Sequence, residues 1–546
     1  MAEMLTLLTS SFHSTANLLI NFASQYGVIF LHGLLLTALL LTVMLSSQTT
    51  ARWKIAQRLL SLHLVASLTL LIISFWHASP QFNNHLSFTP LAMVMMTLIS
   101  FIGLIVLRFA QQNLMGDPDH ARFLKWYLLT LLTVSITVTA NHLALLFFAW
   151  MSISLSLHNL LLFYPQRPRA ALAAHKKFLL ARLSEGLLLS AFIILFWQHK
   201  SLNIDVILAQ YSNIYQVSLA DHLAMVMLAL VALIKCAQLP LHGWLIQVVE
   251  APTPVSALLH AGIINLGGFL LLLFSPLLSL STPAQWLLLI VAGISCVLAA
   301  LIMVTRISIK VRLAWSTVTQ MGLMLVECAL GLYEIALLHL IAHSCYKAHA
   351  FLSSGNAVNN YLGQQYTQAT KPKKHHWLAA FACVGLAGLA LAFALPVLLT
   401  GSVANSFSAP ALISPWLLIA IAVISLLAYH FSSPHKQSIS RAFLVAVIGI
   451  MAYGLLGLVT AQIIPSIINT QTSTQASADT WVSLLFIGLF VTFLWLQYAS
   501  NSKASRQLMI ALNAAFYLDE WVTRITLRLW PVALPNSSAK TIQSNS

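Results

Sequence analysis

The sequence predicts an all-α, polytopic membrane protein, and three observations support this fold class. Hydrophobic residues make up 59% of the 546 residues and charged residues only 7%, which excludes a water-soluble domain because such a domain needs a charged surface. The apolar residues form about 15 segments of roughly 20 residues, the length that spans a bilayer. The few titratable residues inside these segments gather on a small number of helices, as in proteins that conduct ions. We therefore expect about 15 transmembrane helices.

The 27 Lys and Arg residues outnumber the 12 Asp and Glu residues, and their positions indicate topology rather than nucleic-acid binding. They lie in loops between apolar segments and form no basic helix. The loops after the first, third, fifth, ninth, eleventh and thirteenth segments contain Arg52, Lys54, Arg58, Arg108, Arg122, Lys125, Arg167, Arg169, Lys176, Lys177, Arg306, Lys310, Arg312, Lys371, Lys373, Lys374, Lys436 and Arg441. By the positive-inside rule these loops and the C-terminus are cytoplasmic, and the N-terminus is outside.

Residues 235–268, KCAQLPLHGWLIQVVEAPTPVSALLHAGIINLGG, predict a helix that is broken inside the membrane. Pro240 has no N–H to donate, so the carbonyl of Cys236 loses its helical partner. A freed carbonyl at membrane depth is tolerated only where protein or a water-filled cavity satisfies it. Lys235 stands beside this break, and a titratable lysine within an apolar segment is a candidate for ion transfer.

The far side of the break carries further candidates. Glu250 lies in a loop that has no basic residue, which is an exception to the charge pattern of the other loops on that side. Pro252 and Pro254 then begin a second helix, since proline is tolerated in the first helical turn. This second helix carries His260. We expect proton movement to involve Glu250, His260 and the lysine at the break.

The segment 335–355 carries His339, His343 and Lys347 at intervals of four residues, so these side chains line one helix face. Such a stripe can hold a chain of water molecules, and histidine exchanges protons near neutrality because its unperturbed pKa is about 6.5. The stripe therefore predicts an ion path. The alternative is that the histidines only form hydrogen bonds between packed helices. A metal site at His339 and His343 is less consistent with the pattern, and we expect no metal in this chain.

Only Glu185 and Glu327 among the acidic residues lie well inside apolar segments, and a carboxylate in that position usually has a function. Arg182 precedes Glu185 by one helical turn, so a local ion pair is the structural alternative for Glu185. Such a pair would still leave Glu185 able to influence Lys235 if their helices touch.

Four motifs occur in the order KCAQLPLHGWL at 235–245, APTPVSALLHAG at 251–262, STVTQMGLML at 316–325 and HLIAHSCYKAHAFLSSG at 339–355. In these motifs the chain resembles the antiporter-like, proton-conducting membrane subunits of respiratory complex I and of multi-subunit cation/proton antiporters, from about residue 120 to 360. The resemblance implies two inverted repeats of five helices, each with a broken helix. It also implies that Lys235 is the lysine of the first broken helix, that His260 is the histidine of the next helix, and that His339, His343 and Lys347 form a central polar axis.

The resemblance implies five regions. They are N-terminal transmembrane helices at 1–120, a first antiporter-like repeat at 121–275, a second, degenerate repeat at 276–431, C-terminal transmembrane helices at 432–500, and a cytoplasmic amphipathic helix with a disordered tail at 501–546. The chain departs from the family in two places. Met151 follows Trp150 where the family carries a Glu that pairs with the broken-helix lysine. The second broken helix is expected near Pro396, where residues 389–407 contain no charge, so the second half-channel looks disabled.

These departures, together with the motifs EAPTPVSALLHAG and YKAHAFLSSG, make the chain most similar to the membrane subunits of DAB-type inorganic carbon accumulation complexes. That resemblance implies a heterodimer with a large cytoplasmic, zinc-containing, carbonic-anhydrase-like subunit in a bacterial cytoplasmic (inner) membrane. It implies that the proton motive force drives CO₂ hydration or bicarbonate accumulation by that partner. The chain itself carries no cofactor and is not an enzyme in this interpretation. The alternatives are a subunit of a multi-subunit cation/proton antiporter or complex I-like enzyme, and a non-conducting membrane anchor.

Overall fold

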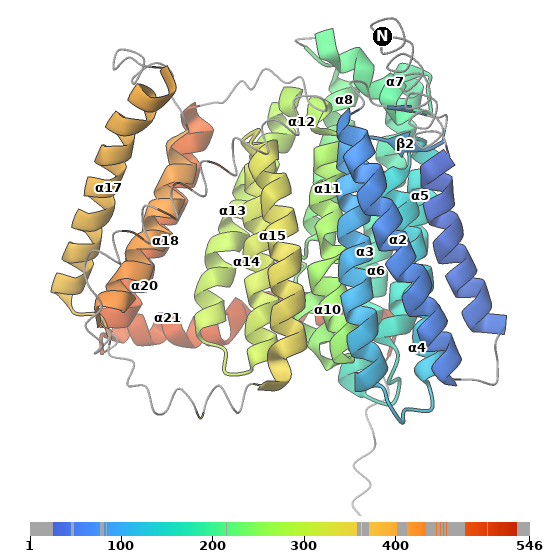
Figure 1. Ribbon diagram of the computed structural model, residues 1–546. Helices are drawn as coiled ribbons and strands as arrows, with labels where there is room; N and C mark the ends of the chain where they lie inside the picture. The colour runs from blue at the N-terminus through green and yellow to red at the C-terminus, as the bar shows by residue number, and fades with distance from the viewer. Residues whose placement is uncertain are drawn as a thin grey trace, which may run out of the picture.

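A computed structural model shows an all-helical bundle with one short β-hairpin (Figure 1). The structure describes residues 26–44, 49–76, 81–82, 85–213, 216–356, 371–400, 412–432, 476–499 and 501–531, together with Leu362, Leu444, Ile448, Met451 and Leu455. The predicted disordered tail beyond residue 531 and most of the predicted span at 442–463 lie outside these ranges. The all-α fold class is confirmed.

The N-terminal half contains the first helix (Tyr26–Met44) and helices that pack as neighbouring pairs. In chain order the elements are α2 (Thr49–Trp76), β1 (Gln81–Phe82), β2 (Ser87–Phe88), α3 (Pro90–Asn113), α4 (His120–Thr139), α5 (Leu143–Leu161), α6 (Pro168–His199), α7 (Ile204–Ala209) and α8 (Leu219–Lys235). Sequential helices such as α2 and α3, or α4 and α5, pack together because short connections return the chain alongside itself.

The second half begins with short helices and continues with long ones. These are α9 (Gly243–Gln247), α10 (Thr253–Ala261), α11 (Leu266–Leu273), α12 (Ser275–Leu280), α13 (Thr282–Val304), α14 (Ile309–Ala329), α15 (Tyr333–Leu352), α17 (Lys374–Thr400), α18 (Ile413–Ser432), α20 (Ala476–Tyr498), α21 (Lys503–Asn513) and α22 (Glu520–Leu529). Ten helices of the described ranges are long and apolar enough to cross a membrane. The expected total of about 15 is compatible with this number and stays a prediction.

The hydrophobic core runs through the bundle from the first helix to α15, and α10 and α11 lie at its centre. Helices α3, α8, α14 and α15 surround them. Close approach is needed at Gly322 of α14, where a Cβ would lie 2.8 Å from the side-chain oxygen of Gln238 and 2.9 Å from the carbonyl of Ala292. Residue 322 must therefore be small for α14 to pack against both α13 and the break after α8.

Helices α17 and α18 stand to one side of the main bundle in Figure 1 and have a small apolar core of their own, around Trp377, Val384 and Leu427. Helix α20 joins them to α13, where the indole N–H of Trp481 donates to the carbonyl of Leu289 at 3.2 Å. Helix α17 runs through Pro396 to Thr400 without interruption, so the predicted break at Pro396 is wrong within the described residues.

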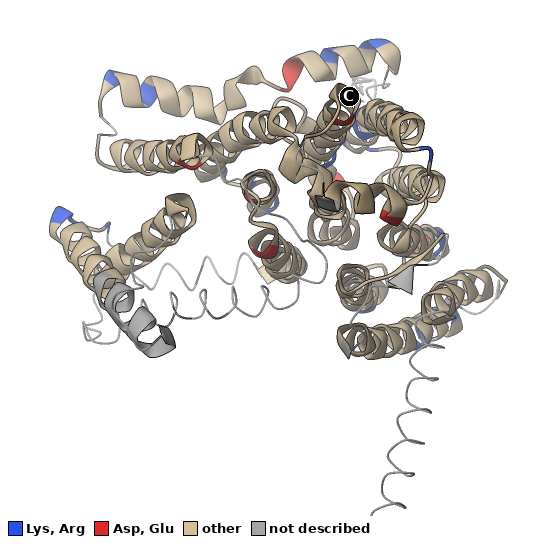
Figure 2. Ribbon diagram, turned by 90° about the horizontal axis from the view of Figure 1, so that it is seen from above, with Lys and Arg blue, Asp and Glu red and all other residues tan. Residues whose placement is uncertain are grey.

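The C-terminal segment forms an amphipathic helix, as predicted, but it is broken into α21 and α22 around Phe516, which has a φ of 52°. We call residues 503–530 the strap. Figure 2 shows the strap running along one side of the bundle, and Figure 1 shows α21 at the lower end. The loops that join α3 to α4, α5 to α6 and α13 to α14 lie at the same end. The second of these loops contains Arg167 and the third contains Arg306, whereas the first contains no Lys or Arg.

Candidate functional site

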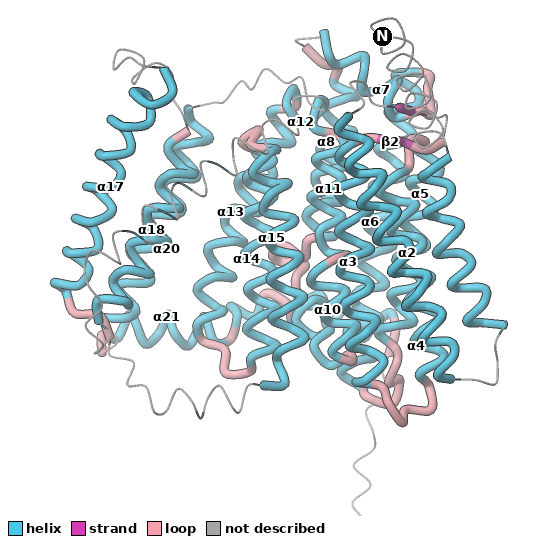
Figure 3. Tube along the Cα trace, viewed as in Figure 1, coloured by secondary structure: helices cyan, strands magenta, loops and turns pink. Residues whose placement is uncertain are grey.

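The predicted break after Lys235 is confirmed. Helix α8 ends at Lys235, and Figure 3 shows loop segments between the helical pieces inside the bundle. The side-chain amide of Gln238 donates to the freed carbonyl of Cys236 at 2.8 Å. The N–H of Leu239 donates to the hydroxyl of Ser295 on α13 at 3.0 Å. Neighbouring protein thus satisfies the backbone groups that the break releases, as a bilayer requires.

The helix after the break is interrupted as well. The sequence predicts one span at 254–275, begun by Pro252 and Pro254, and α10 does begin at Thr253 with Pro254 in its first turn. It ends at Ala261, however, and α11 starts only at Leu266. The side chain of Asn265 donates to the carbonyl of Ala261 at 3.1 Å and to the hydroxyl of Ser344 at 2.6 Å. No proline marks this second break, which is why the sequence did not reveal it.

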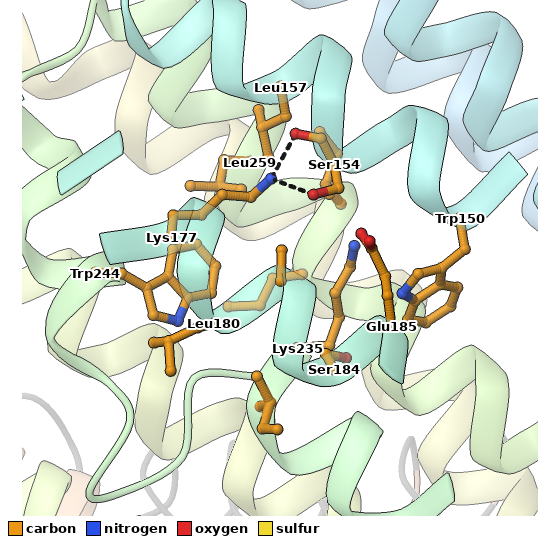
Figure 4. Close-up of a pocket in the computed structure, with 14 residues that line it drawn as sticks. Trp150, Ser154, Leu157, Lys177, Leu180, Ser184, Glu185, Lys235, Trp244 and Leu259 are labelled. Carbon is orange, nitrogen blue, oxygen red and sulfur yellow. Dashed lines mark hydrogen bonds between the residues drawn. The ribbon is translucent and has the colours of Figure 1, made fainter. Parts of the chain in front are cut away.

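Lys235 faces a small chamber beside Trp150 and Glu185 (Figure 4). The amine of Lys235 lies 4.7 Å from the centre of the Trp150 ring, a cation–π distance. It points toward the carboxylate of Glu185 in Figure 4 and interacts with it electrostatically. Trp150 and Glu185 therefore lie beside the amine, whereas Met151 is not one of the residues that line the chamber.

Glu185 forms the predicted local ion pair. Its carboxylate lies 2.9 Å from the guanidinium of Arg182, and the carboxylate is buried while Arg182 is partly exposed. Arg182 also donates to the hydroxyl of Ser154 at 3.1 Å. The prediction that Glu185 would still influence Lys235 agrees with the electrostatic contact between them. The one acid in this chamber is thus shared between Arg182 and Lys235.

Most of the basic residues that were expected in loops lie inside helices, so that part of the topology prediction is wrong. These residues are Arg52, Lys54 and Arg58 in α2, Arg108 in α3, Arg122 and Lys125 in α4, Arg169, Lys176 and Lys177 in α6, Lys310 and Arg312 in α14, and Lys374 in α17. Two of them, Lys176 and Lys177, bear on the site. Both are buried in α6, which begins at Pro168 and so includes them in its third turn. Lys177 lines the same chamber as Lys235 and donates to the carbonyl of Ser154 at 2.8 Å and to its hydroxyl at 3.3 Å. The sequence contained a signal for this helix, since proline is favoured at the first helical position and AALAAHKK has high helix propensity.

The predicted stripe on α15 forms a buried polar axis. Glu327 of α14 pairs with His339 at 3.0 Å, and the other ring nitrogen of His339 lies 2.9 Å from the side-chain oxygen of Gln320. His343 is buried and has no hydrogen-bond partner on either ring nitrogen within the described ranges. Lys347 is fully buried and donates to the carbonyl of Leu313 at 3.0 Å. Unpartnered buried nitrogens at His343 indicate room for water between the paired ends.

His260 joins this axis from α10. Its ring lies 3.1 Å from the hydroxyl of Thr317 and stacks on Phe351 at 4.4 Å between centroids. It interacts electrostatically with both His343 and Lys347. His339 lies toward the α14–α15 turn, and His260 lies beside the middle and lower part of the axis.

Helix α10 separates the chamber from the polar axis. Leu259, with Ile263 and Ile264, lines the chamber. The adjacent His260 faces α14 and α15 instead. A proton that crosses between Lys235 and Lys347 must therefore pass the end of α10, where Asn265 and Ser344 are hydrogen-bonded at the second break.

Glu250 does not contribute to the chamber. Its side chain is 41% exposed and lies 3.9 Å from the guanidinium of Arg169. Glu250 therefore does not act as the acidic partner of Lys235 in this structure. Glu250 remains a candidate for the point where protons leave the protein.

The strap is anchored directly beside the broken helix. Lys176, whose side chain has no exposed surface, lies 2.6 Å from the carboxylate of Asp519 and donates to Thr523 at 2.9 Å. The amide of Gln247 donates to the same carboxylate at 3.3 Å. A Cβ on Gly243 would lie 1.6 Å from a carboxylate oxygen of Asp519, so only glycine leaves room for it. Sequence analysis missed Lys176 and Asp519 because their 343-residue separation gives no local signal.

We expect that Asp519→Asn loosens the strap. The change leaves the buried amine of Lys176 without a counter-charge, which costs about 2 kcal/mol or more. Trypsin should then cleave the purified protein faster at Arg524 and Arg528. Glu520→Gln is the matched control, because Glu520 is the exposed neighbour of Asp519. Equal cleavage of the two variants would contradict an anchoring role for the Lys176–Asp519 pair.

Comparisons with known proteins identify the family. Residues 140–428 match the NADH:quinone oxidoreductase/Mrp antiporter transmembrane family. The chain is 44% identical over 510 residues to the probable inorganic carbon transporter subunit DabB of Hydrogenovibrio crunogenus, which covers 92% of this chain and 95% of that protein. The chain belongs to the DabB family. It is also 36% identical over 466 residues to the probable inorganic carbon transporter subunit DabB2 of Halothiobacillus neapolitanus, over 83% of each chain.

The fold has a solved counterpart. A chain of the Mrp complex from Dietzia sp. DQ12-45-1b superposes with a TM-score of 0.62 at 21% identity, covering 93% of this chain and 60% of that chain. At this identity the similarity shows the fold alone. Together with the family match, it confirms the antiporter-like membrane fold that the four motifs predicted.

Proposed function

We propose that this chain is the proton-conducting membrane subunit of a two-component inorganic carbon accumulation complex. The proton motive force would drive CO₂ hydration or bicarbonate accumulation by a cytoplasmic, zinc-containing, carbonic-anhydrase-like partner. The relatives at 44% and 36% identity are probable inorganic carbon transporter subunits, which supports this physiology. The location is a bacterial inner membrane, with the basic end of the bundle and the strap in the cytoplasm.

The observation that best supports proton conduction is the buried row of titratable side chains on α14, α15 and α10. The row runs from Glu327 and His339 through His343 to Lys347 and His260. His339 and His343 lie 6.3 Å apart between ring centroids, which one water molecule can bridge. Groups that bind and release protons at this spacing can pass a proton along by hydrogen-bonded water.

The proposed route enters at the end of the bundle where Glu327 pairs with His339. It follows the axis to Lys347 and His260, passes the second break beside Asn265, and reaches Lys235 in the chamber. It leaves to the cytoplasm near Glu250. Entry of one proton down a potential of 100 mV releases about 2.3 kcal/mol. That energy shifts an equilibrium in the partner by more than about tenfold, which is enough to make hydration one-way.

Purification from the native membrane in mild detergent, followed by metal analysis, tests the proposed physiology. We expect one large soluble protein to copurify in constant ratio with this chain and to contain zinc. Copurification of several small membrane subunits without zinc would instead support an antiporter or a complex I-like enzyme. A membrane anchor is the remaining alternative, and it predicts that the titratable residues of the axis can be replaced without effect on carbon accumulation.

A further inference from the structure

The chamber beside the broken helix has a largely apolar wall with a few hydrogen-bond donors in it. It has a volume of about 30 Å³, and a cavity of this kind holds about two water molecules. Its polar lining comes from α5, α6, α8 and α9, and comprises Ser154, Lys177, Ser184, Glu185, Lys235 and Trp244. Among these, the hydroxyl of Ser184 and the indole N–H of Trp244 are buried without a hydrogen-bond partner in the described part of the chain.

The charges around the chamber do not balance. Lys177, Arg182 and Lys235 stand against the single carboxylate of Glu185. The guanidinium of Arg182 forms an ion pair with that carboxylate at 2.9 Å. Lys177 binds only the neutral oxygens of Ser154, and Lys235 lies over the ring of Trp150. The residues described around the chamber place no carboxylate within 4.0 Å of either amine.

Two amines that face one cavity repel each other, and Lys177 and Lys235 do interact electrostatically. Burying an amine without a partner is costly, so a buried lysine either loses its proton or gains a hydrogen-bond acceptor or a counter-ion. A cation would add to the repulsion, whereas an anion would accept hydrogen bonds from both amines. The unpartnered donors of Ser184 and Trp244 also suit an acceptor and not a metal ion.

We propose that the chamber binds one small monovalent anion, chloride or hydrogencarbonate, between Lys177 and Lys235. The size of the chamber suits an ion of a few atoms and excludes a larger organic anion. The assignment goes beyond proton conduction, because it rests on the unpaired donors of the chamber and not on the polar axis of α15.

Equilibrium binding of radioactive chloride to the purified full-length chain, together with any partner that copurifies, tests the assignment. We expect saturable binding of one ion per chain that gluconate does not displace. Displacement by hydrogencarbonate but not by nitrate would identify hydrogencarbonate as the preferred ligand, and displacement by both would identify a general site for small anions. Absence of saturable binding to the unaltered protein would overturn the proposal.

Two variants locate the site. Lys177→Met removes one amine, and Ser154→Asp supplies an internal carboxylate beside Lys177 and Arg182. Each should weaken chloride binding by at least about tenfold, a change of about 1.4 kcal/mol. Lys200→Met is the control, because this exposed lysine lies far along α6 from the chamber. If one variant fails to fold, chloride binding to the other variant decides whether the site lies in the chamber. Unchanged binding in the folded variants would place the anion elsewhere and overturn the assignment.

The binding experiment is made without a membrane potential, so it is independent of conduction. Lys347→Met should stop proton flux and leave chloride binding intact, since Lys347 does not line the chamber. Loss of conduction and loss of anion binding can therefore be told apart in the same set of variants.

Discussion

Replacing Lys347 with methionine should reduce proton conduction by about 100-fold or more, the range by which proton transfer by a positioned side chain contributes. Methionine fills a similar volume but cannot carry a proton. Lys347 is fully buried and lies between His343 and His260 in the electrostatic contacts of the axis. Without Lys347, the row of buried titratable side chains on α15 would end at His343.

Proton flux into proteoliposomes, driven by a potassium diffusion potential and followed with an internal pH-sensitive dye, measures this effect. The variant should fold, because the hydroxyl of Thr317 also donates to the carbonyl of Leu313 and keeps it paired. His349→Gln is the matched control on the same helix, since His349 is exposed and outside the axis. If Lys347→Met conducts as fast as this control, the axis does not carry protons.

The parts of the site that the sequence predicts are those controlled by local chemistry. Pro240 removes a donor four residues after Cys236, so the break and its position beside Lys235 follow from the backbone alone. The four-residue spacing of the α15 stripe likewise follows from helix geometry. The resulting buried axis is confirmed as an arrangement of side chains.

The parts that the sequence does not predict depend on contacts between distant segments. Lys176 was assigned to a loop because a basic pair at the edge of an apolar run resembles a topology signal. Its buried charge is possible only because Asp519 of the strap lies 2.6 Å away. The partner of the freed carbonyl of Cys236 also depends on how Gln238 packs beside Gly322 of α14.

The two halves of the site differ in how their charges are compensated. On the axis, Glu327 lies against His339, and the carbonyl of Leu313 receives the amine of Lys347. In the chamber, Glu185 is held by Arg182 at 2.9 Å, and Lys235 lies over the ring of Trp150 and interacts with Glu185 from beyond 4.0 Å. The amine of Lys235 is therefore the less firmly held of the two. A loosely held amine beside a helix break suits the step at which proton movement becomes movement of the protein.

Replacing Lys235 with methionine should abolish carbon accumulation while the complex still assembles. The side chain is the titratable group at the end of α8, and α9, which follows the break, lies against the strap through Gly243 and Gln247. If protonation of Lys235 moves α9, the contacts of Gly243 and Gln247 with Asp519 would pass that movement to the strap. Without the amine, protons that reach the second break would have no group to couple to that movement.

Growth at low CO₂ of a host that depends on this complex, with assembly checked by copurification, measures the loss. We expect at least about a 100-fold lower accumulation rate in Lys235→Met. Lys200→Met should behave as the unaltered protein, because it removes an equal charge from an exposed position at the far end of α6. Normal accumulation in an assembled Lys235→Met complex would show that coupling does not pass through the broken helix. If the variant complex assembles but accumulates no inorganic carbon, misfolding and a damaged partner interface are both excluded as causes. The coupling step would then lie at the amine of Lys235.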